Sequence, residues 1–419
     1  MRRLVLSLVP SVLIGLAGCQ MGSPAGNPVP PGPPPVEWSA EMQAVADGNN
    51  WFALDLYAKL RGMKGNLFFS PYSAHTALAM TAAGAKGATR DQTVTVLHLP
   101  AEEQKAGASG DLGRFYAHPR EDYELSVANA LWGQKGYPWR PEFLDLQRTR
   151  FGAGFREADF ATDPEAERKR INGWVEEQTR DRIKELLRER LITNRHRMVL
   201  VNAVYFKGAW KDQFDPKQTR PLPFTQADGT KTPVPMMHRE GGFRHYVEPR
   251  TDGKWGAEFQ VAELPYKGGE LSMVVLLPGT HDGLPALEAK LTADALAGWL
   301  AKAKDAGEAD LDLPKFRIET DAMMLKDPLQ QLGMVAAFDP FAADFTGLHT
   351  GGEQLFVDFV VQKAFVDVNE EGTEAAAATA VGVRGDSARR GFQADHPFLF
   401  LIRDTQRGTI LFLGRVEKP

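Results

Sequence analysis

Residues 369–380 have the sequence NEEGTEAAAATA, and the interpretation of the whole chain depends on this stretch. Its four consecutive alanines, at 375–378, would favour a helix in isolation, because alanine loses no side-chain entropy there. The preceding LFVDFVVQKAFVDV (355–368) is β-branched and aromatic with partial alternation, which predicts a long, largely buried strand. After a loop-like segment (381–391), FQADHPFLFLI (392–402) is again typical of a strand. A run of mostly small residues, without a clear helix or strand pattern, therefore joins two predicted strands.

The composition of the 419 residues is that of an ordinary soluble globular protein, with 43% hydrophobic and 25% charged residues. The net charge of −5 is mildly acidic, so nucleic acid is not expected as a partner. After residue 37 the sequence contains no internal repeat and no interdomain linker. Predicted helices concentrate in the N-terminal half and predicted strands in the C-terminal half. We therefore expect one large α+β domain over residues 37–419.

The first 36 residues differ in character from the rest. Arg2 and Arg3 precede an apolar run, which is the layout of a secretory signal. LAGC at 16–19 resembles a bacterial lipobox, which implies removal of residues 1–18 and acylation of Cys19, the only cysteine. A signal peptide with an incidental cysteine is the alternative. Residues 22–36 hold seven prolines and three glycines and predict an extended tether. We expect export and a lipid anchor in the bacterial cell envelope, on its periplasmic or surface face.

Periodicity predicts the elements of the body of the chain. Strands are expected at 66–69, 124–132, 198–210, 311–320 and, as a hairpin, 257–279, with a further β region over 233–246. Helices are expected at 38–60, with a break near Gly48 as an alternative, and at 70–84, 171–190, 284–304 and 321–335. The basic residues of 171–190 could form a patch for an anionic ligand, but the interleaved Glu and Asp residues favour a solvated face.

The sequence contains few signs of catalytic residues. The sequence contains no GxSxG elbow, HExxH zinc helix, Walker loop, GxGxxG fingerprint or CxxC pair. The nine histidines are too far apart for a sequence-local metal site. An enzyme whose Ser, His and Asp residues meet only on folding stays an alternative. The sequence favours a protein with no catalytic residues, no metal and no cofactor.

A series of motifs along the chain carries a family resemblance. In order they are NLFFSPYSAHTALAMTAAGAKGATRDQT (66–93), VNAVYFKGAW (201–210), ELPYKGGELSMVVLLP (263–278) and LPKFRIE (313–319), with LGM (332–334) and ADFTGL (343–348) after them. The stretch around 369–380 and FQADHPFLFLI (392–402) follow. Together these motifs identify the chain as a member of the serpin family, with 369–380 resembling its hinge and 392–402 its C-terminal signature. The resemblance covers the chain from about residue 40 onward. It implies a serpin fold with three β-sheets, eight to nine helices and an exposed reactive loop at about 369–391.

The resemblance also implies a function. A target serine protease, or a cysteine protease, would cleave the loop, form its acyl-enzyme and be trapped as the cleaved loop inserts into the main β-sheet. The chain would then be a monomeric suicide substrate and not an enzyme. A non-inhibitory serpin with a binding or chaperone-like role is the alternative.

The hinge residues implied by the resemblance would permit insertion. They are Glu370, Glu371, Gly372, Thr373, Glu374, Ala375, Ala376, Ala377, Ala378 and Thr379. Side chains alternate between the two faces of a strand. One face would carry Thr373, Ala375, Ala377, Thr379, Val381 and Val383, which are all small or apolar. The charged Glu374 and Arg384 would lie on the other face.

The resemblance assigns two further sets of residues. Ser70, Ser73, Asn202, Trp210 and Gln362 match an opening region beneath the main sheet, with Trp210 where the loop enters. Many inhibitory serpins have histidine where this chain has Gln362, so the hydrogen bonds could persist but any pH sensitivity of an imidazole would be absent.

The reactive bond is expected between Asp386 and Ser387, fourteen residues after Gly372 and twelve before Phe398. It implies a target that cleaves after aspartate. The bond Arg384-Gly385 is the alternative and implies a trypsin-like target. Residues 384–386 also spell Arg-Gly-Asp, which we interpret as a coincidence.

Overall fold

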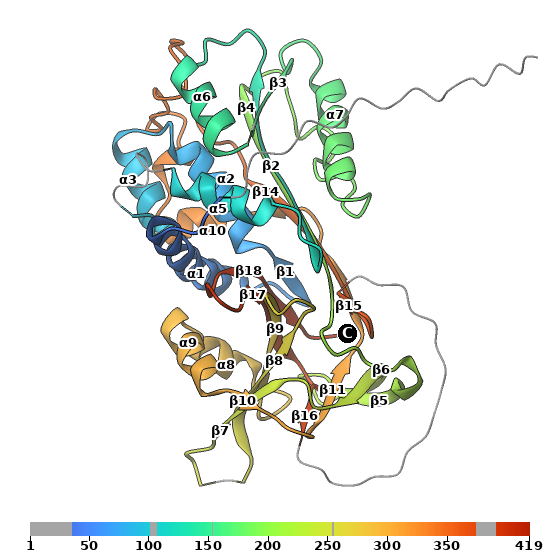
Figure 1. Cartoon of the computed structure of the whole chain (residues 1–419). Coiled ribbons are helices and arrows are strands. Elements are labelled where there is room, and N and C mark those ends of the chain that lie inside the picture. Colours follow the sequence, from blue (N-terminus) through green and yellow to red (C-terminus); the bar gives the residue numbers. More distant parts are fainter. Residues whose placement is uncertain (1–35, 101–106, 153, 254, 374–390) are drawn as a thin grey trace, which may run out of the picture. The chain divides into compact units, whose positions relative to one another are not determined.

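The computed structural model describes residues 36–100, 107–152, 154–253, 255–373 and 391–419 (Figure 1). Val36–Pro419 forms one compact unit. In the described part of the chain we find nine α-helices and three β-sheets, which confirms the predicted α+β serpin fold. No helix among these residues has the length and apolar character that crossing a membrane requires.

The N-terminal part is mainly helical, with α1 (Ala40–Leu60), β1 (Leu67–Phe69), α2 (Pro71–Ala82), α3 (Gly87–Val96) and α5 (Ala108–Ala117). Ser70 caps α2 by accepting a hydrogen bond from the Ser73 amide, and Pro71 occupies the first helical position. Helix α1 is continuous through Gly48, so the alternative of a break there is wrong. A Cβ atom at this glycine would lie 2.3 Å from the His98 carbonyl oxygen, so the close contact with the next segment explains its presence.

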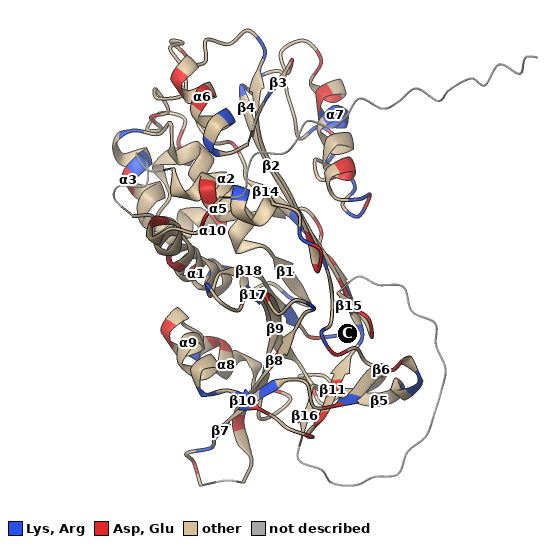
Figure 2. Cartoon of the chain, viewed as in Figure 1, with Lys and Arg blue, Asp and Glu red and all other residues tan. Residues whose placement is uncertain are grey.

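One of the two seven-stranded sheets is mixed and is here called the main sheet. Its strands are, in spatial order, β12 (Phe316–Glu319), β14 (Val361–Val368), β15 (Gly372–Thr373), β4 (Met198–Ala209), β2 (Tyr123–Gln134) and β3 (Phe155–Ala158), with β13 (Met323–Met324) paired to β14. Figure 2 shows β2 and β4 uncharged along most of their length. Their only charged residues, Glu124 and Lys207, are directly opposite each other.

Two further sheets complete the fold. The second sheet has the order β1, β18 (Ile410–Val416), β17 (Phe398–Asp404), β9 (Leu271–Pro278), β8 (Ala257–Pro265), β7 (Arg244–Pro249) and β10 (Lys304–Asp305). The third sheet has the order β16 (Phe392–Gln393), β11 (Asp310–Pro314), β6 (Lys231–Glu240) and β5 (Arg220–Thr225). The remaining helices are α6 (Pro141–Arg150), α7 (Pro164–Gln178), α8 (Leu284–Lys290), α9 (Ala293–Lys302) and α10 (Lys326–Leu332), with short 3-10 turns at Pro216–Gln218 and Ala336–Phe338.

Helices cover both faces of the main sheet. In Figure 1, α7 lies on one side of β2 and β4, and α2 and α5 lie on the other side. Along β4, Leu200, Val204 and Phe206 belong to the larger core, which includes the second sheet. Val201 and Tyr205 point the other way, into a smaller core that includes residues of α7. A strand buried on both faces is mostly apolar, and β4 is apolar apart from a few residues such as Asn202 and Lys207, which explains why it was predicted from the sequence.

The helix predicted at 171–190 is wrong in its second half, because α7 is Pro164–Gln178 and the chain from 179 is irregular. Arg180, Asp181, Glu185 and Arg190 have positive φ angles, which are incompatible with a helix. Tertiary hydrogen bonds replace the helical ones. The Asn172 side chain donates to the Leu187 carbonyl and accepts from the Leu187 amide, both at 2.9 Å.

Other predicted boundaries also need correction. The predicted helix at 284–304 is two helices, because the Thr292 hydroxyl caps α9 by accepting from the Ala295 amide. Helix α10 occupies only part of 321–335. Strand β14 begins at Val361, although residues 355–360 were predicted to belong to it. Leu355 and Val357 are buried in the core without belonging to a strand. The strand predicted at 392–402 is divided between β16 and β17, which lie in different sheets.

Candidate functional site

The boundary between β4 and β14, here called the seam, has two differently built parts. In its lower part the strands pair directly and in parallel, from Val361 opposite Val201 to Phe365 opposite Tyr205. In its upper part β15 lies between them and pairs antiparallel with both, with Thr373 opposite Val368 on one side and Gly208 on the other. Gly372 and Thr373, the last described residues of the predicted hinge, therefore already occupy the top of the seam.

Gly372 is required where the chain enters the seam. A Cβ atom at this position would lie 2.1 Å from the Gly208 carbonyl oxygen. Only glycine allows the backbones to approach this closely. The next residue, Thr373, is buried, and its hydroxyl lies 2.7 Å from the Tyr266 hydroxyl.

A group of uncharged side chains lies beneath the lower seam and is here called the polar cluster. It consists of Ser70, Ser73, Asn129, Asn202 and Gln362, which come from the start of α2 and from β2, β4 and β14. The Asn202 amide donates to Ser73 Oγ and to Asn129 Oδ1, both at 2.6 Å. On the other side of the seam, the Gln362 amide donates to the Ser70 carbonyl at 2.9 Å and accepts from the Ser70 amide at 3.0 Å.

Only one side-chain hydrogen bond in the polar cluster crosses directly from β14 to β4. Gln362 Nε2 donates to Asn202 Oδ1, and these two residues are opposite each other in the strand pairing. A strand that entered between β4 and β14 would break this bond. Each amide would keep its other partners, Ser70 for Gln362 and Ser73 for Asn202. The cluster can therefore divide along the seam and leave few buried polar groups without a partner.

A second group holds the hinge at the upper seam and is here called the upper cluster. It consists of Trp210, Thr219, Tyr266, Lys315, Asn369, Glu370, Glu371 and Thr373. The Trp210 indole donates to the Asn369 carbonyl, and the Trp210 amide donates to the Glu371 carbonyl, both at 2.9 Å. The Trp210 and Tyr266 rings are stacked with their centroids 4.7 Å apart. Trp210 thus binds the entering chain through its backbone carbonyl groups.

Glu370 is a buried charged residue of the upper cluster and forms an ion pair there with Lys315. Its side chain is buried, with Lys315 Nζ at 2.8 Å from one carboxylate oxygen and Thr219 Oγ1 at 2.7 Å from the other. Burial alone would raise the pKa of Glu370, but the hydrogen bonds from Lys315 and Thr219 outweigh it and lower the pKa below its usual value. Burial also raises the pKa of Tyr266 far above its usual value, so the phenol stays neutral and can hydrogen-bond to Thr373.

The structure brings four of the five predicted opening residues, Ser70, Ser73, Asn202 and Gln362, into the polar cluster. Trp210 lies apart from them, in the upper cluster. Of the hinge, Glu370, Glu371, Gly372 and Thr373 are described. The predicted hinge residues 374–379, the reactive bonds Asp386-Ser387 and Arg384-Gly385, and Cys19 lie outside the described residues.

Sequence reasoning missed Asn129, Thr219, Tyr266 and Lys315. Asn129 gave a signal that could have been used, because it is a lone amide within the apolar strand ELSVANALW. Lys315 gave none, since a lysine between Pro314 and Phe316 is unremarkable until folding brings it to Glu370. Within the described ranges, no group of three or more His, Cys, Asp and Glu residues is arranged to hold a metal ion.

Comparisons with known proteins agree on one family. Residues 47–419 match a sequence model of the family described as "Serpin (serine protease inhibitor)". The human leukocyte elastase inhibitor is 38% identical, over 90% of this chain and 100% of its own length. Mouse antithrombin-III is 36% identical, over 92% of this chain and 84% of its own. A crystal structure of uncleaved ovalbumin superposes with a TM-score of 0.79 at 29% identity, over 90% of this chain and 100% of that one.

Proposed function

Because this chain belongs to the serpin family, we propose that it irreversibly inhibits a serine or cysteine endopeptidase as a suicide substrate. The protease nucleophile would attack the carbonyl carbon of the reactive residue, and the following residue would leave as a free amine. The chain would then carry an ester, or a thioester, to the protease. Insertion of the cleaved loop into the main sheet would move the protease before water could hydrolyse this bond.

The observation that carries the proposal is the position of β15. Gly372 and Thr373 already pair with β14 and β4 as the first two residues of a central strand. A strand continuing downward in the same direction would separate the parallel pair β4–β14 and form two antiparallel interfaces in its place. The residues that would follow Thr373 on the same face of such a strand are all small or apolar, so no bulky or charged side chain would have to enter the core there.

The energy of such an insertion would be large enough to act on a protease. One parallel interface of about five residue pairs would be exchanged for two longer antiparallel ones. With a net gain of about 1 kcal/mol per additional hydrogen bond, a strand of about a dozen residues would gain roughly 10 kcal/mol. This is comparable to the whole stability of an ordinary domain. The named activities of two relatives, an elastase inhibitor and an antithrombin, support a protease as the partner.

The test is an incubation of the protein with a panel of serine and cysteine proteases, followed by denaturing gels. We expect a covalent complex that survives denaturation with at least one protease that cleaves after Asp or Arg. Mass spectrometry of the released C-terminal peptide would then choose between Asp386 and Arg384. Clean loop cleavage without any stable complex would reject inhibition and support a non-inhibitory serpin.

Thr373→Arg tests the insertion step itself. The buried Thr373 side chain faces Tyr266, and an arginine there could not be accommodated in the core. We expect the variant to be cleaved by the target without forming a complex. The matched control is Thr373→Val, which keeps the shape and removes only the hydroxyl, and it should still inhibit. If Thr373→Arg inhibited normally, insertion would not be the mechanism.

We also propose that Cys19 is lipidated and anchors the chain to the cell envelope. The basis is the lipobox-like LAGC and the proline-rich stretch at 22–36, which precedes the compact unit. Several acyl chains at about 0.8 kcal/mol per buried CH₂ would suffice for stable attachment. Cys19→Ala should release the protein into the soluble fraction after export, and a variant that stayed with the membrane would argue against the anchor.

A further inference from the structure

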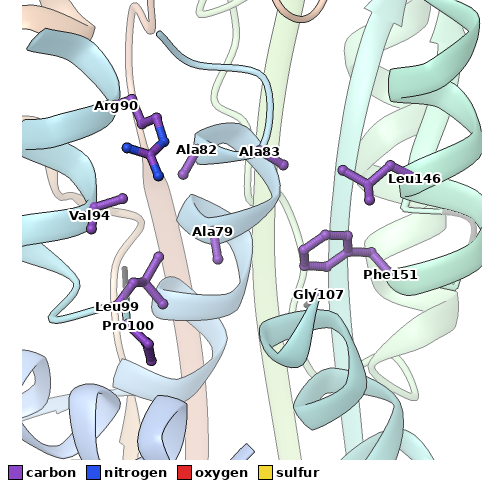
Figure 3. A pocket seen from close by; sticks show the side chains of 10 residues that line it. All are labelled: Ala79, Ala82, Ala83, Arg90, Val94, Leu99, Pro100, Gly107, Leu146 and Phe151. Atoms are coloured by element: carbon purple, nitrogen blue, oxygen red, sulfur yellow. The ribbon is translucent and has the colours of Figure 1, made fainter. Parts of the chain in front are cut away.

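A groove between the turn after α1 and the start of α8 is not accounted for by the inhibitory mechanism. Its volume is about 660 Å³. Small-molecule sites in proteins have volumes of a few hundred to about a thousand Å³. By contrast, the recess between α2, α3 and α6 in Figure 3 has a volume of about 30 Å³, which is room for about one water molecule. Of the two, only the groove can hold an organic molecule.

One wall of the groove is cationic. Arg61 and Lys64 are exposed residues of the turn after α1, and both line the groove. The buried Arg415 holds this turn by donating to the Arg61 carbonyl at 2.8 Å and to the Gly65 carbonyl at 2.9 Å. The turn is thus fixed through its backbone, independently of its side chains. Among the residues that the structure describes, the Arg61 and Lys64 side chains have no hydrogen-bond or ion-pair partner.

The wall formed by α8 and the turn before it is acidic, with Asp282 and Glu288. The hydrogen bond from the Thr280 hydroxyl lowers the pKa of Asp282, so this carboxylate is charged at neutral pH. Glu288 is only 9% exposed. Its Oε1 accepts from the Tyr57 hydroxyl at 2.5 Å and lies 3.4 Å from Arg415 Nη1. Its Oε2 has no partner in the described part of the chain, so half of this carboxylate is free.

The free charges of the two walls do not meet. Arg415 forms ion pairs with Glu288 and with Glu417, which also lines the groove. Arg61 and Lys64 form none within the described ranges. The rest of the lining is mainly apolar and includes Leu284, Pro285, Ala289 and Pro397. With His281 neutral, the charged lining residues balance and give a dipolar groove without net charge; they are Arg61, Lys64, Arg415, Asp282, Glu288 and Glu417.

From this arrangement we infer that the groove binds a small zwitterion with an apolar body, such as a free apolar amino acid. Its ammonium donates to Glu288 Oε2, its carboxylate accepts from Arg61 and Lys64, and its side chain packs on the apolar lining. A simple anion would leave the Glu288 oxygen without a partner, and a simple cation would leave both cationic side chains without one. This inference does not depend on protease inhibition.

The first test is isothermal titration calorimetry of the purified chain with phenylalanine and three relatives of it. We expect phenylalanine to bind at one saturable site at concentrations up to about 10 mM. N-acetylphenylalanine lacks the ammonium and phenylalanine amide lacks the carboxylate. Each should bind at least about tenfold more weakly, as expected for the loss of a charge-assisted hydrogen bond. Alanine should also bind at least about tenfold more weakly, because it lacks the ring. No saturable binding of phenylalanine, or equally tight binding of either derivative, would overturn the inference.

Substitutions at the two walls place the binding in this groove. Arg61→Ala combined with Lys64→Ala should remove the preference for phenylalanine over its amide. This pair should fold, because Arg415 binds the backbone of the turn. The matched control is Lys59→Ala, an exposed lysine of α1 that does not line the groove, and it should leave both affinities unchanged.

Glu288→Gln should instead remove the preference for phenylalanine over N-acetylphenylalanine. Its amide oxygen can still accept from the Tyr57 hydroxyl, so the buried contact is kept. If this buried variant failed to fold, the exposed pair would still decide the question. An unchanged preference for phenylalanine over its amide after removal of Arg61 and Lys64 side chains would place the ligand elsewhere and overturn the inference.

Discussion

The two clusters along the seam are built from different chemistry, although Asn202 in β4 and Trp210 directly after β4 are only eight residues apart in the chain. The polar cluster beneath the lower seam is neutral and consists of amides and hydroxyls that bind each other. The upper cluster contains an ion pair and a stacked aromatic pair, and it binds the backbone of the entering hinge. In the lower part the strands are still paired directly, and in the upper part they are already separated.

This difference indicates that the two clusters would have different roles in the proposed insertion. The polar cluster holds the seam closed through the Gln362–Asn202 bond, which would have to break. The upper cluster holds the hinge in place, and its contacts could persist. Substitutions in the polar cluster should therefore change the cost of opening, whereas those in the upper cluster should change how firmly the hinge is held.

Glu370→Lys should have the largest effect on stability. It replaces a buried carboxylate by an ammonium next to Lys315, which loses its partner. Breaking a buried ion pair by removing one member costs about 3–5 kcal/mol. We expect a loss of this size in the unfolding free energy, measured with urea. The matched control is Glu371→Lys, which makes the same charge change one residue later, and it should cost less than about 0.5 kcal/mol. Equal losses in both would mean that the ion pair is not what stabilises the hinge.

Asn202→Ala and Gln362→Ala should each destabilise the protein by about 1–3 kcal/mol, because each leaves buried partners unsatisfied. Their effects should not be additive, with an interaction energy of at least about 0.5 kcal/mol, since the two amides bind each other across the seam. Asn202→Ala combined with Trp210→Phe is the control. This pair should be additive, because its members belong to different clusters. Additivity of Asn202→Ala with Gln362→Ala would show that the seam has no such link.

The two clusters should also differ in their response to acid. The pKa of Glu370 is lowered in the folded protein, so its carboxylate contributes stability above the unfolded pKa, near 4.3, and this contribution is lost as the pH falls through the folded pKa. The difference in unfolding free energy between the unmodified chain and Glu370→Gln should therefore be constant at neutral pH and shrink below about pH 4.5. The difference for Asn202→Ala should not change over the same range. A pH-dependent effect of Asn202→Ala would contradict the neutral character assigned to the polar cluster.

The sequence predicted the upper and lower seam unequally, and the reason is physical. Ser70, Ser73 and Asn202 were predicted because each lies in a stretch that resembles a family block, and Gln362 because many inhibitory serpins have a histidine at its position, before Lys363. Tyr266 and Lys315 lie within such stretches too, but nothing in their local pattern indicates a contact with Thr373 or Glu370. Such contacts join positions more than fifty residues apart, and periodicity carries no information about them.

The errors in the fold have a similar origin. Ile183, Leu186 and Leu187 are buried, as the amphipathic pattern of 171–190 predicts, yet they belong to an irregular segment. The Leu187 backbone is hydrogen-bonded by the Asn172 side chain, and the Ile183 amide donates to Thr179 Oγ1, which a helical pattern cannot reveal. Likewise, residues 355–360 are apolar because they fill the core, and not because they pair in a sheet. An apolar pattern therefore predicted burial better than it predicted the type of backbone.

Trp210→Phe should have the smallest effect and separates two ways of holding the hinge. Phenylalanine keeps a ring that can stack on Tyr266, but it cannot donate to the Asn369 carbonyl, which then lacks this partner. Loss of one such hydrogen bond costs about 1 kcal/mol. Since the Trp210 amide still binds the Glu371 carbonyl, the hinge should stay in the seam, and complex formation with the target should be retained. Trp210→Ala removes the stack as well and should cost more. If both variants lost the same free energy, the stacked ring would contribute nothing, and the upper cluster would hold the hinge by hydrogen bonds alone.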